Sequence, residues 1–527
     1  MTAADLLLVN GRVLTMDPAL PYASAVAIRG NEIVHVGPDA AGWAGAEVVD
    51  LRGRIVLPGI NDSHLHACGY GLHRPPFCVN VALGSIEEVR RVVAAAVREA
   101  RPGAWIRGTG WNPGYLAECL ADPGRRPRAA DLDDVAPDHP VVLQDFSGHT
   151  TWANSAALAA AGLSGDGLLH HGDQGLVQRL VPAPEGGMIA VLRDVVAELN
   201  RLGITSFTEP GLGRGGEEAF AGGMGSGVLT AYAELAREGE LSARVSVLGL
   251  PSPMSGASVA DTEAYLAGLS GEPVWDGVDP RVLRVLGVKV FADGIPPSET
   301  AWMREAYPSG GHGSLCTHGG TDAERVAELD EILRLIHLAG LQAGVHVVGS
   351  RGIDAVADAL AALNREHPRP DARHYVIHGQ FASKSALTTL GELGYGINLQ
   401  PVLQAMESGT TRALFGEEAA AQEWPARSAI DAGVLTACSS DAPVTGPDWR
   451  AGVAALTARD GEGITLEEAL RTYTSAPARQ DFAERWKGTI TAGKVADLCV
   501  SGATGLAEIT AAPVELTVFD GRVVHSC

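Results

Sequence analysis

The sequence predicts an α/β protein: a (β/α)8 TIM-like barrel, a small β-sandwich domain built from both chain termini, and an insertion after the first barrel strand. Three observations support this fold class. Eight short apolar runs alternate with amphipathic helical stretches, which is the pattern of βαβ units and a parallel sheet. Both ends of the chain carry short strands joined by Gly-containing turns. The length of 527 residues corresponds to roughly three domains of about 150 residues, or to one large barrel with accessories.

The sandwich domain is expected from residues 1–57 together with residues 485–527. Asn10-Gly11 and Asp520-Gly521 are typical hairpin turns between short apolar strands. Strands at either end of the chain need partners, and the two segments can supply them to each other. The strands expected here are 6–9, 13–16, 25–29, 33–36, 496–500, 514–519 and 523–524.

The barrel is expected over residues 58–484, with the insertion at about 67–201. Within the insertion, a helix over 85–101 and a strand over 141–146 are predicted. Outside it, the helix over 322–339 places several aliphatic side chains on one face. The eight predicted barrel strands are 55–66, 204–209, 243–250, 283–293, 342–348, 374–379, 395–400 and 434–441.

Charge and cysteine usage narrow the classes of partner. Lys and Arg total 40 against 63 Asp and Glu, a net charge of −23, so nucleic acid and an anionic membrane are not expected as partners. Seven cysteines without CxxC pairs indicate reduced thiols, and no secretory signal or long apolar stretch is visible. We expect a cytoplasmic protein with a small-molecule substrate, and a homodimer as the commonest assembly.

The strongest local motif is the HxH pair, His64 and His66, at the end of the first predicted barrel strand. Side chains alternate along a strand, so both imidazoles project to one face and can reach one ion. Taken alone, an HxH pair is as compatible with a structural role as with metal binding.

Four further polar residues end other predicted strands: Lys289, His346, His378 and Asp441. Lys289 lies in an apolar run where a lone ammonium is costly to bury. The carboxyl ends of barrel strands form the rim where barrel enzymes carry their chemistry. A single such residue is usually a core side chain whose hydrogen bonds are made within the core. Polar residues at the ends of five strands, all on one rim, indicate an active site.

These motifs, in this order, resemble the amidohydrolase superfamily, and specifically the large-insertion branch of amidohydrolase family 3 that includes N-substituted formamide deformylases. The resemblance covers nearly the whole chain, including Gly108-Thr109-Gly110-Trp111-Asn112 and the element 148–155 around His149. It implies a metal-dependent hydrolase that cleaves the amide C–N bond of a small N-acyl or N-formyl compound with an apolar substituent.

The resemblance also implies a metal centre with two divalent ions. His64, His66 and Asp441 would hold one ion, and His346 and His378 the other. Lys289 matches the lysine that is carbamylated in binuclear members and bridges both ions; an unmodified lysine paired with Asp293 is the alternative. These ligands suit Zn²⁺, with Fe²⁺, Mn²⁺ or Co²⁺ also possible.

The implied mechanism uses a metal-activated hydroxide. Asp441 would move its proton to the leaving nitrogen, or would act as a ligand only. Two other functions stay open: a mononuclear deaminase or cyclic amide or imide hydrolase on the same barrel, and a non-catalytic scaffold. Every expected ligand is present, which argues against the scaffold.

Three residues outside the ligand set are candidate substrate contacts. His149 could polarise a substrate carbonyl or could form a structural hydrogen bond. Trp111 could pack against an apolar substituent or belong to the core. His312 lies in a Gly- and Pro-rich stretch, 294–320, that could be a mobile lid or an inert loop.

Two departures from the family pattern concern carboxylates near the ligands. Val347-Val348 follows His346 where many relatives carry Gly-Asp, and Ile377 precedes His378 where many carry Glu. Both leave the ligands intact but put the substrate preference of relatives in doubt for this chain.

Overall fold

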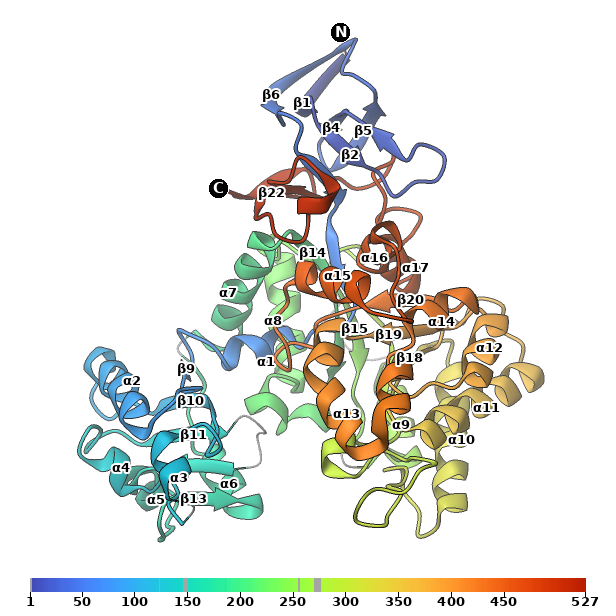
Figure 1. Ribbon diagram of the computed structural model, residues 1–527. Helices are drawn as coiled ribbons and strands as arrows, with labels where there is room; N and C mark the ends of the chain where they lie inside the picture. Colours follow the sequence, from blue (N-terminus) through green and yellow to red (C-terminus); the bar gives the residue numbers. More distant parts are fainter. Residues whose placement is uncertain (1, 123, 146–149, 185, 255, 270–275) are drawn as a thin grey trace. The chain divides into compact units, whose positions relative to one another are not determined.

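The computed structural model describes residues 2–122, 124–145, 150–184, 186–254, 256–269 and 276–527 (Figure 1). The chain divides into two compact units. The first contains Met1–Ala67, Val195–Glu218 and Met224–Cys527, and the second contains Cys68–Asp194 and Ala219–Gly223. The insertion predicted over 67–201 therefore falls almost entirely on the second unit.

Two sheets at the ends of the chain bring the termini together, as the sequence predicts. One sheet has the order β5-β4-β1-β6, and the other has the order β23-β22-β21-β7-β2-β3. In the second sheet β21, from near the carboxyl terminus, pairs antiparallel with β7. Aliphatic side chains of both sheets share one core cluster. The strands are β1 (Thr2–Val9), β2 (Arg12–Leu14), β3 (Tyr22–Ala23), β4 (Ala25–Arg29), β5 (Glu32–Gly37), β6 (Trp43–Asp50), β7 (Ile55–Pro58), β21 (Leu498–Ser501), β22 (Val514–Phe519) and β23 (Arg522–Ser526).

Eight parallel strands form the predicted barrel, in the order β20-β19-β18-β17-β16-β15-β14-β8. A side-chain bond from Ser63 Oγ to the Cys438 carbonyl, 2.7 Å, joins the two ends of this sheet. Asn398 donates to Ser63 as well, so three strands meet at the closure. The strands are β8 (Ile60–Asp62), β14 (Ile204–Leu212), β15 (Arg244–Gly249), β16 (Leu283–Phe291), β17 (Gln342–Val347), β18 (Tyr375–His378), β19 (Gly396–Leu399) and β20 (Leu435–Cys438).

The first predicted strand, 55–66, is wrong in one respect, because it is two strands that belong to two sheets. β7 joins the terminal sheet and β8 joins the barrel, with Gly59 between them. A Cβ atom on Gly59 would lie 2.0 Å from Oγ1 of Thr205, so only glycine fits where the chain passes from one sheet to the other. His64 and His66 consequently follow the barrel strand rather than end it.

Helices connect the barrel strands. The predicted helix over 322–339 is α10, and its aliphatic face is buried; Thr321 and Glu324 form a capping box at its start. The helices of the first unit include α8 (Ser226–Arg237), α9 (Val259–Gly268), α10 (Asp322–Leu338), α11 (Ser350–Glu366), α12 (Lys384–Leu393), α13 (Pro401–Gln422), α14 (Ala426–Asp431), α15 (Trp449–Ala458), α16 (Leu466–Thr472) and α17 (Ser475–Gln480).

The insertion has a sheet and core of its own. Its strand order is β13-β12-β11-β10-β9, with the predicted strand present as β11 and the predicted helix as α2. Ser85 caps α2 by accepting from the Glu88 amide. The elements are α1 (Ala67–Leu72), β9 (Val79–Asn80), α2 (Ile86–Glu99), β10 (Ile106–Trp111), α3 (Ala117–Ala121), α4 (Ala130–Asp133), β11 (Val141–Asp145), β12 (Thr150–Ala153), α5 (Ser155–Ala160), β13 (Leu168–His170), α6 (His171–Gln178) and α7 (Gly187–Arg201).

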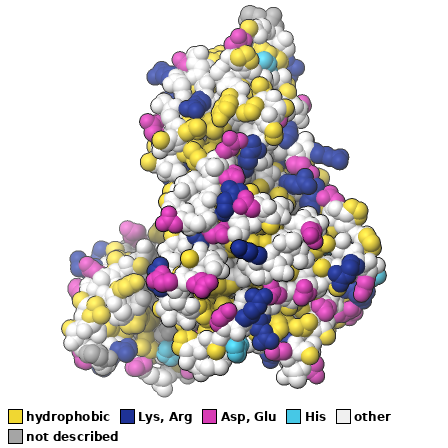
Figure 2. All heavy atoms as spheres, turned by 45° about the vertical axis from the view of Figure 1, so that its right-hand side comes forward, with side chains coloured by type: hydrophobic (Ala, Val, Ile, Leu, Met, Phe, Trp, Pro, Cys, Tyr) yellow, Lys and Arg dark blue, Asp and Glu magenta, His cyan; other side chains and the backbone are white. Residues whose placement is uncertain are grey.

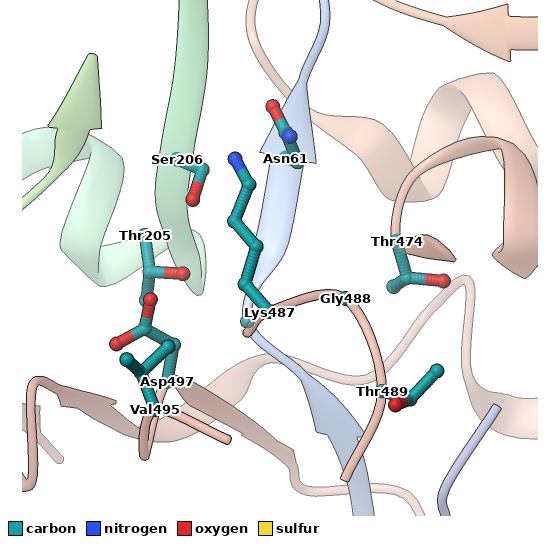
Figure 3. A pocket seen from close by; sticks show the side chains of 10 residues that line it. Asn61, Thr205, Ser206, Thr474, Lys487, Gly488, Thr489, Val495 and Asp497 are labelled. Carbon is teal, nitrogen blue, oxygen red and sulfur yellow. The ribbon is translucent and has the colours of Figure 1, made fainter. Parts of the chain in front are cut away.

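The amino end of the barrel is filled by the residues that follow α17. Asp481 accepts from Asn61 of β8 at 3.0 Å and from Thr208 of β14 at 3.3 Å. Lys487 donates to the same carboxylate at 3.0 Å. Figure 3 shows the Lys487 side chain running between Ser206 and Asn61 in a small polar pocket. This end of the barrel is therefore closed by a buried ion pair.

The surface mixes charges of both signs. On the face drawn in Figure 2, Lys and Arg side chains are scattered among Asp and Glu side chains. None of the helices within the described ranges combines the length and apolar character that a membrane crossing requires.

Candidate functional site

Two histidines and an aspartate meet at the carboxyl end of the barrel strands. His64 and His66 follow β8, and Asp441 follows β20. Nε2 of His64 lies 3.1 Å from Oδ1 of Asp441, and Nε2 of His66 lies 3.5 Å from the same oxygen. One ligand atom of each residue lies within 4.8 Å of the others, and all three side chains are buried. A group of this composition can surround one divalent ion.

A second pair of imidazoles adjoins this group. The rings of His346, on β17, and His378, at the end of β18, have centroids 4.5 Å apart. The His378 ring lies 5.6 Å from that of His64. Lys289 reaches the same place from β16, with Nζ 4.6 Å from the Phe291 ring centroid. The structure therefore brings together all six residues whose pattern indicated a metal centre.

Burial lowers the pKa of all four imidazoles. The pKa values of His64, His66 and His346 fall well below the ordinary value, because burial penalises the charged form. Burial likewise lowers the pKa of His378 to about 4. The Lys289 ammonium acts in the same direction on each ring. These rings are neutral near pH 7, which is the state that can bind a metal through a nitrogen lone pair.

The proton on His378 is placed by Gln400. Oε1 of Gln400 lies 2.7 Å from Nδ1 of His378, while its Nε2 donates to Asn398 and to Ser439 at 2.8 and 2.9 Å. Because the amide nitrogen is engaged by these acceptors, the amide oxygen faces the ring and Nδ1 of His378 carries the proton. Nε2 of His378 therefore presents its lone pair.

Lys289 is buried without a carboxylate partner. Its side chain is 2% exposed, and no carboxylate of the described chain lies within ion-pair distance of its Nζ. Burial lowers its pKa to about 7, and the charge of Asp441 opposes this shift. The alternative pairing with Asp293 is wrong, because the Asp293 oxygens accept the amides of Trp302, Val348 and Gly349, each at 2.9 Å.

Two of the six residues have a strained backbone. His378 has φ 71° and Asp441 has φ 57°, both in the left-handed region that side chains with a Cβ rarely adopt. Such strain is found mainly where the surrounding structure fixes a functional side chain. Gly379 follows His378 with φ 60°, so the turn after β18 is left-handed over two residues.

Asp62 is a positioning carboxylate that the sequence analysis missed. It is buried at the end of β8 and accepts the amide of His64 at 3.3 Å and that of Ser440 at 3.1 Å. It thereby joins the segment with the HxH motif to the segment with Asp441. Burial raises the pKa of Asp62 to about 7. Its position two residues before His64 could have identified Asp62 as a candidate. Its contact with Ser440 could not be predicted, because Ser440 lies far away in the sequence.

Glu209 is a second buried carboxylate that the sequence analysis did not select. It lies on β14, is 0% exposed, and accepts from the Tyr232 hydroxyl at 2.8 Å and the Ala67 amide at 3.1 Å. Its Oε1 lies 3.7 Å from Nδ1 of His66. Burial raises the pKa of Glu209 to about 8. The sequence pattern that could have identified Glu209 is the one that identified Lys289: a charged residue at the end of an apolar run.

The three candidate substrate contacts lie in other segments of the chain. Trp111 is 2% exposed in the core of the insertion, where Nε1 donates to the Leu143 carbonyl at 2.8 Å and the ring meets Trp152. His149 lies outside the described residues. His312 is exposed, and its carbonyl accepts the Met303 amide. Their proposed substrate contacts stay predictions.

The stretch 294–320 is packed at several points. Ala301, Met303 and Tyr307 are buried with Val348 in one apolar cluster. The Tyr307 ring lies 5.3 Å from that of Phe415. This loop therefore packs against Val348 and against Phe415 of α13.

The two departures from the family pattern have apolar or backbone roles here. Ile377 is buried beside Leu248 and Tyr375. The backbone of Val348 donates to Asp293. Asp293 is thus a carboxylate that contacts the segment after His346, through the amides of Val348 and Gly349.

The donor set fits a metal centre on chemical grounds. Four neutral imidazoles, one aspartate and one buried lysine without a carboxylate converge at the end of a barrel. Imidazole and carboxylate ligands suit Zn²⁺ and similar ions. Lys289 fits conversion to a carbamate, since that group would supply the negative charge that the lysine lacks nearby.

A barrel with this arrangement at the carboxyl ends of its strands defines the class of metal-dependent hydrolases. Residues 47–525 match the amidohydrolase family, and the chain belongs to that family. It is accordingly a metal-dependent amidohydrolase, an enzyme that acts on C–N bonds.

The chain is similar to one curated relative over most of its length and shares its fold with solved structures. An N-substituted formamide deformylase of Arthrobacter pascens is 27% identical, with 94% of this chain and 93% of the relative covered. A metal-dependent hydrolase from Pyrococcus horikoshii OT3 shares the fold, with a TM-score of 0.74, 21% identity, and 99% and 100% of the two chains covered. Atrazine chlorohydrolase TrzN from Arthrobacter aurescens TC1, solved with zinc, has a TM-score of 0.55 at 15% identity, covering 99% and 95%.

Proposed function

We propose that this enzyme hydrolyses the amide bond of a small N-acyl or N-formyl compound with an apolar substituent, using two divalent metal ions. His64, His66 and Asp441 would hold one ion, and His346 and His378 the other. A carbamate on Lys289 would bridge them. Zn²⁺ is the preferred metal, given the imidazole-rich set and the zinc in the TrzN structure.

One observation carries this proposal. Three buried ligand atoms lie within 4.8 Å of one another, and a lysine without a carboxylate partner lies among the neighbouring imidazoles. The formamide substrate class is supported by the deformylase relative, which covers 94% of the chain.

When bound, two such ions supply a hydroxide nucleophile near pH 7 and polarise a carbonyl group. Asp441 would act as a general base and then as a general acid. As the base, its carboxylate accepts the proton released from water and donates it to the leaving nitrogen as the C–N bond breaks. Gln400 keeps the proton of His378 on Nδ1, and Asp62 holds the segments carrying His64 and Asp441 together.

The test is a hydrolysis assay with matched variants. Purified enzyme with added Zn²⁺ and bicarbonate is offered N-formyl and N-acetyl derivatives of small apolar amines, and the released amine is measured. The double variant His64→Asn/His66→Asn should abolish turnover and keep the fold. The control, His318→Asn/His367→Asn, changes two exposed histidines and should leave turnover unchanged.

Other results would contradict the proposal. Undiminished turnover in the His64→Asn/His66→Asn variant would exclude this site as the reaction centre. Release of ammonia rather than an amine, with one metal ion per chain, would instead support the mononuclear deaminase.

A further inference from the structure

Two barrel strands that supply no proposed ligand each place a buried polar group behind an imidazole. At the end of β19, Gln400 bonds Nδ1 of His378 at 2.7 Å. On β14, Glu209 lies on the Nδ1 side of His66, at 3.7 Å, while Nε2 of His66 faces Asp441 at 3.5 Å. Each ring thus has a buried polar group on its Nδ1 side.

The Glu209 carboxylate is held in place from its other side. The Tyr232 hydroxyl and the Ala67 amide both donate to Oε2. Oε1 is buried and has no hydrogen-bond partner among the described residues. A buried carboxylate oxygen without a donor is costly, so its position calls for a donor that the structure places nearby. The nearest imidazole is that of His66.

We propose that Glu209 is a positioning residue for His66: its Oε1 accepts the Nδ1 proton when the ion is bound, which leaves the Nε2 lone pair for the metal. This inference rests on the proposed metal centre. A histidine ligand whose second nitrogen donates to a carboxylate is better oriented and more basic. The present separation of 3.7 Å exceeds a hydrogen bond, so the proposed role requires the two side chains to approach each other when the metal is bound. Tyr232 acts one step further back, through Glu209.

The test measures zinc affinity of the full chain without any substrate. Metal-free wild type, Glu209→Gln and Tyr232→Phe are titrated with Zn²⁺ against a chromophoric chelator, and their metal-free unfolding temperatures are compared. Glu423→Gln is the matched control. Glu423 is also 0% exposed, with Oε2 bonded by Thr411 and Gln380 and Oε1 without a partner in the described chain, and no proposed ligand contacts its carboxylate.

We expect Glu209→Gln to weaken the binding of one zinc ion, the one held by His66, by about 10- to 100-fold. Tyr232→Phe should weaken the same ion by about five-fold, because it removes one hydrogen bond to the carboxylate. Glu423→Gln should bind zinc like the wild type. All four metal-free proteins should unfold at similar temperatures. If Glu209 had a purely structural role, Glu209→Gln would instead lower the unfolding temperature of the metal-free protein.

Two outcomes would overturn the inference, and they differ. Wild-type zinc affinity in both Glu209→Gln and Tyr232→Phe would refute the role of Glu209 while leaving the metal centre intact. A wild type that binds no metal would refute the proposed function and this inference with it. If Glu209→Gln does not fold, Tyr232→Phe decides the question alone.

Discussion

The two ends of the barrel each bury a lysine, and they treat it differently. At the amino end, Lys487 donates to Asp481 at 3.0 Å, and Asn61 and Thr208 hold the same carboxylate. At the carboxyl end, Lys289 has imidazoles and the Phe291 ring around it, and no carboxylate of the described chain within ion-pair distance. Burial lowers the pKa of both.

This difference distinguishes a lysine that pairs with a carboxylate from one that, in the proposed function, reacts with CO₂. A buried ammonium that is paired keeps its charge and closes the barrel. A buried ammonium without a counter-charge is driven toward the neutral amine, which is the form that can react with CO₂. Burial alone would not distinguish the two, because both lysines are at most 5% exposed.

The largest expected effect is on catalysis at Lys289. Lys289→Met should reduce turnover of a formamide substrate by at least about 100-fold, because it removes the group that we propose to bridge two metal ions. Lys487→Met should not affect turnover per folded molecule. Equal activity in the two variants, each measured per mole of folded enzyme, would contradict the proposal that Lys289 is needed for catalysis and Lys487 is not.

The second largest expected effect is on the stability provided by the ion pair at the amino end of the barrel. Lys487→Met should lower the free energy of unfolding by about 3 kcal/mol, because it leaves the buried Asp481 carboxylate without its cation. Lys289→Met should change the stability of the metal-free protein little, since it removes an unpaired buried amine. Denaturant unfolding of both metal-free variants measures this, and a reversed order of stability would show that Lys487 is not the structural lysine.

The pH dependence of metal loading sharpens the comparison further. The pKa of Lys289 in the metal-free protein is about 7, so the neutral amine is lost as pH falls through that value and gained as pH rises. The neutral fraction is roughly ten-fold larger at pH 8 than at pH 6. Recovery of activity after adding Zn²⁺ at a fixed CO₂ concentration should accelerate over this range. A rate independent of pH would argue against carbamate formation at Lys289.

The smallest expected effect is at Thr208, which bonds the Asp481 carboxylate from β14. Thr208→Val should lower the free energy of unfolding by about 1 kcal/mol, as one hydrogen bond is lost. Zinc affinity should be unchanged, although Thr208 directly precedes Glu209. A weaker zinc affinity in this variant would show that the two ends of the barrel are coupled through β14.

The barrel strands were predictable because a buried parallel strand is a short apolar run between turns, and each of the eight predicted runs overlaps one, although β14 extends beyond the predicted 204–209. The exception was the join at Gly59, where one continuous run serves two sheets. Periodicity cannot show that change, since it depends on Thr205 approaching from β14. The insertion's sheet order likewise depends on contacts that the sequence does not display.

Within the site, the six proposed ligands could be selected from the sequence because each lies near or just beyond the carboxyl end of a barrel strand. Asp62, Glu209 and Gln400 were missed for a physical reason. Each acts on an atom supplied by another strand, and a polar residue at a strand end does not indicate which neighbour it faces. The role of Trp111 also depended on its surroundings, which are the core of the insertion.

The most direct test of the account is the metal content of the full chain. Wild type and Lys289→Met, both reconstituted with Zn²⁺ and bicarbonate, are analysed for zinc per polypeptide chain. We expect two zinc ions per wild-type chain and fewer than two in Lys289→Met. A wild-type chain with no bound zinc, or a Lys289→Met chain that retains two, would contradict the central claim that this lysine joins a binuclear centre.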